Sequence, residues 1–217
     1  MRFLVKLLVN IVSLALIMPF AHAFWAEVIG FDTGVDRNWM FLGGTLFSAI
    51  VCYVLARRLE FFATFEHELT HNIWALLFFK KPMGFHVNED GSGLFQFKGR
   101  TSTISELFIS LAPYFFPTAT VLLIMVSPVI KEGFMGFYYL LIGITYGYHI
   151  SSTIRETHLQ QTDITGNGYF TSFNLITSLN LLTNGLVLAF ISGGWGAMGD
   201  FFTDSFTFAT ESVQNWY

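Results

Sequence analysis

Two histidines and a glutamate stand close together in residues 65–71, inside an otherwise apolar stretch. They form the pattern His-Glu-x-x-His, made by His67, Glu68 and His71. On an α-helix, residues four apart share one face, so both imidazoles can reach a single metal ion. A carboxylate beside the first histidine can hold and deprotonate a water molecule on that ion. The spacing therefore predicts a hydrolytic zinc (Zn²⁺) centre with His67 and His71 as ligands and Glu68 as the catalytic base.

The composition of the chain is typical of a protein embedded in a membrane. Apolar residues make up 53% of it and charged residues only 12%, which is unlike a soluble enzyme. Ionisable side chains are costly in a membrane and indicate function there. The net charge of −4, without a basic patch, argues against nucleic acid as a partner. With Cys52 as the single cysteine, any metal must be held by histidine and carboxylate.

The hydropathy pattern predicts a mainly α-helical, polytopic membrane protein with about five to six membrane helices. The expected spans after the N-terminal segment are residues 39–56, 59–79, 104–130, 134–150 and 169–191. Residues 24–217 are interpreted as one membrane-embedded core. Its last part, residues 192–217, is aromatic-rich, and we expect it to be a tail at the membrane interface.

Residues 1–23 allow two interpretations. They combine a basic start, an apolar stretch and the small residues Ala21 and Ala23. This arrangement fits a first membrane helix, and it also fits a signal peptide that is cleaved after Ala23. The sequence leaves both open.

The helix expected over residues 59–79 must turn its polar groups inward. On a helical wheel Glu60, Thr64, His67 and His71 share one stripe, and bulky apolar residues lie opposite. The potential metal ligands therefore face a protein or water interior.

Residues 83–98 change to an alternating apolar and polar pattern around a group of turn residues, which predicts a β-hairpin. An exposed edge strand next to a metal site can bind an unwound substrate as an added strand. We therefore expect Phe95, Gln96 and Phe97 to contact substrate, although a membrane-surface loop is an alternative.

Two later spans contain helix-modifying residues. Pro113 and Pro117 interrupt the span 104–130, and prolines free backbone carbonyls that a neighbour must satisfy inside a membrane. Gly143 and Gly147, four residues apart, favour close packing against another helix.

Catalytic zinc usually takes three protein ligands, so a third must come from elsewhere in the chain. The candidates are His22, His86, His149, His158, Glu156 and Asp163. Asp163 is distinctive because it is a short carboxylate before a Gly-containing turn and a membrane helix. A carboxylate near a helix start can also serve as an N-cap, which is the competing interpretation.

Taken together, these features resemble the site-2 protease family of intramembrane zinc metalloproteases. The resemblance covers about residues 59–191 and includes the F-x-H-E-x-x-H motif, the β-type segment, the Pro-containing span and a distant Asp. The family's third ligand lies in an L-D-G-type motif, which here corresponds to Thr162-Asp163-Ile164 with Gly166 displaced. The resemblance thus implies Asp163 as the third ligand. No segment is long enough for a PDZ or CBS domain, so this would be a minimal core.

The resemblance also implies a zinc-dependent intramembrane endopeptidase that hydrolyses peptide bonds of transmembrane proteins by metal-activated water. Its partners would be such a substrate and the lipid bilayer, in a multi-pass protein of a bacterial inner membrane. Two alternatives remain: a non-catalytic membrane-complex subunit that retains a metal site, and a membrane zincin of another family with Glu156 as third ligand. The oligomeric state is not indicated.

Overall fold

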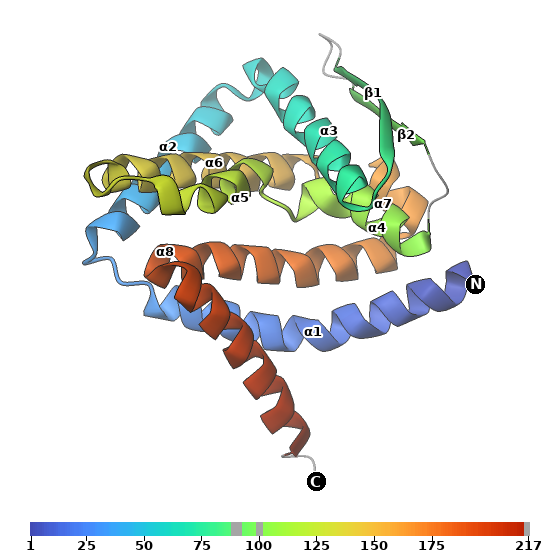
Figure 1. The fold of residues 1–217 in the computed structure, drawn as a ribbon. Coiled ribbons are helices and arrows are strands. Elements are labelled where there is room, and N and C mark those ends of the chain that lie inside the picture. The colour runs from blue at the N-terminus through green and yellow to red at the C-terminus, as the bar shows by residue number, and fades with distance from the viewer. Residues whose placement is uncertain (88–92, 99–101, 215–217) are drawn as a thin grey trace.

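The computed structural model describes residues 1–87, 93–98 and 102–214, without the side chains of Arg57 and of residues 82–98. This part is mainly α-helical, as the sequence predicted (Figure 1). The helices are α1 (Arg2–Gly30), α2 (Asp36–Val54), α3 (Glu60–Leu77), α4 (Thr103–Leu111), α5 (Thr118–Met125), α6 (Met135–Glu156), α7 (Thr162–Asn167) and α8 (Tyr169–Gln214).

Helices α2 and α6 pack closely along their length, and glycines make this contact possible (Figure 1). A Cβ atom on Gly143 would meet the carbonyl oxygen of Phe41, and one on Gly147 would meet that of Thr45. From the other side, a Cβ on Gly44 would meet the carbonyl of Leu140. The close packing expected from Gly143 and Gly147 is therefore confirmed.

Helix α1 runs beside the first half of α8 and in the same direction (Figure 1). It continues without interruption past Ala23 to Gly30. Phe20 and Ala23 are buried in a cluster with Ala189 and Phe201 of α8. The segment 1–23 is thus part of a long packed helix.

The span expected over residues 104–130 is broken in the middle. Helix α4 passes into the 3₁₀ turn η2 (Ala112–Tyr114), and α5 leaves at an angle of 91° to α4 and η2. Pro113 and Pro117 lie at this break, where proline cannot supply the helical N–H. The bend brings α4 and η2 against the motif helix α3.

Fewer helices qualify as membrane spans by length and hydropathy than the five to six expected. Within the described residues, α1 and α8 are long and apolar enough to cross a membrane, and α4 with α5 make a third if the bent pair counts as one span. The other expected spans contain polar residues, which lower their hydropathy. Several of these polar side chains face the protein interior. Ser48 of α2 and His149 of α6 are only 5% and 2% exposed.

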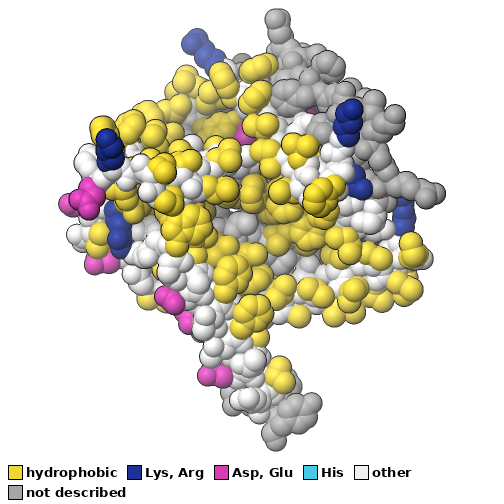
Figure 2. Space-filling model, viewed as in Figure 1, with side chains coloured by type: hydrophobic (Ala, Val, Ile, Leu, Met, Phe, Trp, Pro, Cys, Tyr) yellow, Lys and Arg dark blue, Asp and Glu magenta, His cyan; other side chains and the backbone are white. Residues whose placement is uncertain are grey.

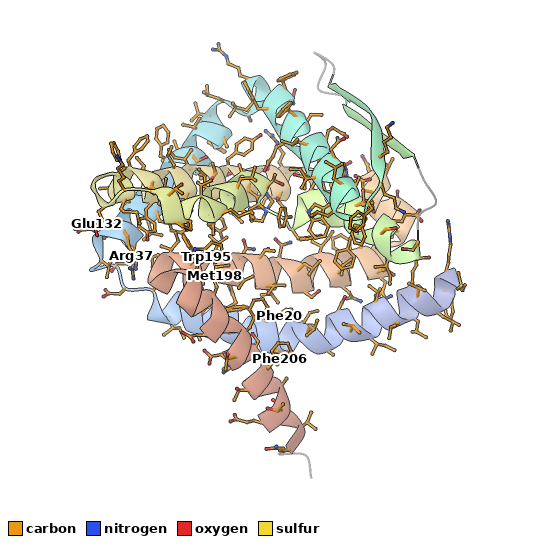
Figure 3. The ribbon with its side chains drawn as sticks, viewed as in Figure 1. Phe20, Arg37, Glu132, Trp195, Met198 and Phe206 are labelled. Carbon is orange, nitrogen blue, oxygen red and sulfur yellow. The ribbon has the colours of Figure 1, made fainter. Side chains whose placement is uncertain are left out.

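Helix α8 bends sharply at Gly194, whose φ of 72° suits glycine (Figure 3). The guanidinium of Arg37 donates to the carbonyl of Ser192 beside this bend. Beyond it, the expected tail is helical as far as Gln214, and it turns back towards α1, where Phe201 stacks on Phe20 with ring centroids 6.4 Å apart.

Strands β1 (Lys81–Val87) and β2 (Gly93–Lys98) form an antiparallel pair that begins two residues before the range 83–98 predicted as a hairpin and ends with it. The chain reaches β1 through a turn that ends α3, in which Phe79 has a φ of 55° and the N–H of Lys80 bonds the carbonyl of Ala75. This turn sets the pair alongside α3.

Apolar side chains cover most of the helical body on the face shown in Figure 2, whereas charged side chains gather at its ends and edges. Large side chains such as Leu46 and Phe47 are more than half exposed. A wide apolar surface of this kind is typical of a protein in contact with lipid.

Candidate metal centre

The motif helix α3 and the short helix α7 bring three potential metal ligands together. His67 and His71 lie one turn apart on α3, and Asp163 comes from the first turn of α7. One ligand atom from each of the three lies within 4.8 Å of the others. The site is largely shielded, since His71 is 5% and Glu68 8% exposed.

The distances from the two histidines to Asp163 suit a single tetrahedral ion. Nε2 of His67 is 3.4 Å from Oδ2 of Asp163, and Nε2 of His71 is 3.5 Å from the same oxygen. Two ligand atoms bound to one tetrahedral zinc lie about 3.3–3.6 Å apart, given the usual bond lengths. The residues present therefore fit a zinc ion.

Each of the two imidazoles is also hydrogen-bonded through Nδ1, the ring nitrogen that does not face Asp163. Nδ1 of His71 is 2.7 Å from the carbonyl oxygen of Ile109, and Nδ1 of His67 is 2.8 Å from Oε2 of Glu156. A carbonyl or carboxylate oxygen accepts, so each Nδ1 carries the proton. In a neutral imidazole this leaves the lone pair on Nε2, the atom that faces Asp163.

Asp163 is held by neighbours on two elements. The hydroxyl of Tyr114 in η2 donates to Oδ2 over 3.3 Å, and the side chain of Asn167 donates to the carbonyl of Asp163. Burial alone would raise the pKa of Asp163, but the adjacent imidazoles of His67 and His71 outweigh it and hold that pKa below its usual range. The N-cap of α7 is Gln161, so Asp163 does not fill the capping position considered from sequence.

Glu68 lies beside the two histidines and borders a cavity of about 490 Å³. Its Oε2 atom is buried and has no hydrogen-bond partner among the described residues. A buried carboxylate oxygen without a partner is costly unless a ligand or water uses it. This arrangement suits a base acting on a water molecule in the cavity.

The other third-ligand candidates do not join the three-ligand group found among the described residues. Glu156 contacts the Nδ1 side of His67, and His158 lines the cavity without joining the three-ligand group. His149 lies on α6 with its Nδ1 4.0 Å from Glu66, and His22 stacks on Phe208. The side chain of His86 is outside the described part of the chain.

The residues expected to contact substrate are on β2, since Phe95, Gln96 and Phe97 belong to Gly93–Lys98. Their side chains lie outside the described part of the chain, so the expectation stays a prediction.

Sequence reasoning missed Tyr114 and the carbonyl of Ile109. Tyr114 is completely buried, and its ring meets that of His67 edge-on at 5.4 Å between centroids. Nothing in its sequence context distinguishes it from a core aromatic residue. The carbonyl of Ile109 could have been identified from the sequence, because the residue four positions later is Pro113, which has no N–H to bond it within the helix.

The family comparison agrees with the motif. A protein-family model described as Peptidase M50B-like matches residues 39–146, about half of the chain, and this range includes His67, Glu68 and His71 but ends before Asp163. No curated protein and no solved structure matches the chain. The chain therefore belongs to the Peptidase M50B-like group, and the match supports the site-2 protease assignment predicted from the sequence.

Proposed function

We propose that this protein is a zinc-dependent intramembrane endopeptidase. The observation that carries the proposal is the convergence of His67, His71 and Asp163. Nε2 of each histidine lies at a distance from Asp163 that suits one tetrahedral ion, and Nδ1 of each is hydrogen-bonded to another group. Three protein ligands with a fourth position left for water are typical of catalytic rather than structural zinc.

Each side chain of the site has a defined task in this proposal. His67, His71 and Asp163 hold the zinc ion, which when bound lowers the pKa of a water molecule and polarises a peptide carbonyl. Glu68 accepts the proton of that water through Oε2, which has no hydrogen-bond partner in the described part of the chain, and then donates it to the amine of the leaving peptide. Tyr114 keeps the carboxylate of Asp163 in place by its hydrogen bond.

The substrate we propose is a transmembrane protein that unwinds locally. A helical peptide bond has its carbonyl hydrogen-bonded and shielded, so it must become extended before attack. The strand pair next to α3 offers edges to which an extended segment can be added, with β2 around Phe95–Phe97 as the proposed contact. The setting we propose is a bacterial inner membrane, with the chain crossing it several times.

The experiment compares the wild-type protein with Glu68→Gln, expressed in matched bacterial cells. Zinc is measured on the purified proteins, and the membrane fraction is searched for shortened fragments of membrane proteins. We expect equal zinc in both proteins and fragments only with the wild type. Absence of zinc from the wild-type protein, or the same fragments from Glu68→Gln, would overturn the proposal and favour a non-catalytic subunit.

A further inference from the structure

The carboxylate of Glu156 touches a metal-ligand candidate from the side away from the metal. It stands at the last residue of α6, and its Oε2 atom is 2.8 Å from Nδ1 of His67. We infer that Glu156 is a positioning residue that orients His67 for zinc binding and is not itself a ligand. This inference rests on the proposed zinc site.

The geometry of the ring separates these two roles. The two nitrogens of an imidazole point in diverging directions, so a group bonded at Nδ1 lies away from an ion bound at Nε2. Nε2 of His67 faces Asp163 over 3.4 Å, whereas Nδ1 faces Glu156. An ion shared by His67, His71 and Asp163 is therefore on the opposite side of the ring from Glu156.

The bond has a chemical effect as well as a steric one. A carboxylate that accepts the Nδ1 proton fixes the tautomer, prevents rotation of the ring and makes Nε2 more basic. The pair is sheltered, with the side chains of His67 and Glu156 12% and 21% exposed, so water competes weakly for it. Loss of such an outer partner typically costs about 10–100-fold in metal affinity.

The two imidazoles differ in the kind of partner that holds them. His71 is held by a main-chain carbonyl, which no side-chain substitution removes, whereas His67 is held by a charged side chain. Replacing Glu156 therefore removes the group that orients His67 and leaves the three proposed metal ligands in place. The inference can therefore be tested at this position.

The test uses the full-length protein and four variants, Glu156→Ala, Glu156→Gln, Asp163→Ala and Glu60→Ala. Glu60 is the matched control because it is exposed, lines the same cavity and lies two turns before His67 on α3. Zinc affinity is measured by competition with a chelator, and the ligand set by the absorption spectrum of the cobalt-substituted protein. Circular dichroism shows whether each variant is folded.

We expect Glu156→Ala to lower zinc affinity about 10–100-fold while the cobalt bands keep their positions. Glu156→Gln, whose amide oxygen can still accept from Nδ1, should recover most of the affinity, and Glu60→Ala should match the wild type. Asp163→Ala should lose the metal or shift the cobalt bands.

Two results would overturn the inference. Affinity in Glu156→Ala equal to that in Glu60→Ala would show that the contact does not position His67. A loss as complete as in Asp163→Ala, with shifted cobalt bands and no recovery in Glu156→Gln, would make Glu156 a ligand. Failure of the wild-type protein to bind zinc would instead refute the proposed function, so the two failures are distinguishable.

Discussion

The imidazole of His71 donates from Nδ1 to the carbonyl oxygen of Ile109, over 2.7 Å. In an uninterrupted helix that carbonyl would accept from the N–H four residues later, but the residue there is Pro113, which has none. The proline break in one helix therefore supplies the acceptor that orients a metal ligand on another. This also satisfies a freed carbonyl, as a membrane interior requires.

Replacing this proline should weaken metal binding. In Pro113→Ala the new N–H can bond the carbonyl of Ile109 and compete with His71 for it. We expect zinc affinity to fall about tenfold, at the lower end of the range for outer partners, because a carbonyl can accept two bonds. The control is Pro117→Ala, in the same break, which restores no N–H opposite Ile109. Equal affinities in the two variants would contradict the role given to this carbonyl.

The site also predicts how metal binding depends on pH. Protons compete with zinc for Nε2 of His67 and of His71, whereas Asp163 stays ionised because its pKa is held below the usual range. Zinc affinity should therefore fall as the pH decreases, because a proton on Nε2 removes the lone pair that the metal needs. Chelator competition at several pH values between about 8 and 5 measures this fall. An affinity that does not change over this interval would argue against histidine ligands.

Local features of the site followed from the sequence. The motif helix was expected over residues 59–79 and is found at Glu60–Leu77, because the apolar and polar stripes of that segment have the helical period. Gly143 and Gly147 also indicated that their helix packs closely against another one, since close approach of two helices needs residues without side chains. These signals are local, and they do not depend on which elements become neighbours.

Other features depend on tertiary contacts and could not be predicted from the sequence. Glu156 was a possible ligand from the sequence, and its role depends on the contact that the end of α6 makes with Nδ1 of His67. Two or three helices of the described residues reach the length and hydropathy of a membrane span, fewer than the five to six expected, and buried polar residues such as His149 lower the hydropathy of other helices. Asp163 was distinctive from its position before a membrane helix, and the family resemblance strengthened that preference over the other candidates.

Replacing Gly143, at the contact between α2 and α6, with a larger residue should destabilise the protein. A side chain on Gly143 would collide with the backbone of α2 at Phe41, and backbone cannot move aside as a flexible side chain can. We expect Gly143→Val to lower the free energy of unfolding by about 1–3 kcal/mol, measured by thermal unfolding in detergent. Gly136→Val is the control, since nothing lies within 4 Å of a Cβ there. Equal unfolding temperatures for the two variants would contradict the close packing.

The N-terminal helix is bonded to the part of the chain that carries Asp163. The ammonium of Lys6 donates to the carbonyl of Asn167, the last residue of α7, over 2.7 Å. One turn further, Asn10 donates to Thr171 and accepts from Asn174, each over 3.0 Å. Polar groups in such a buried network are costly to leave unpaired.

These contacts predict that residues 1–23 stay in the mature protein as a structural helix. Cleavage after Ala23 would require an extended, accessible segment, but Phe20 and Ala23 are helical and only 5% and 2% exposed. We expect the intact mass of the purified protein to include these residues. Asn10→Ala should lower stability by about 1–3 kcal/mol, whereas Val12→Ala, at an exposed position of the same helix, should change it little. A mass that begins after Ala23, in a protein that still binds zinc, would show that α1 is dispensable to the site.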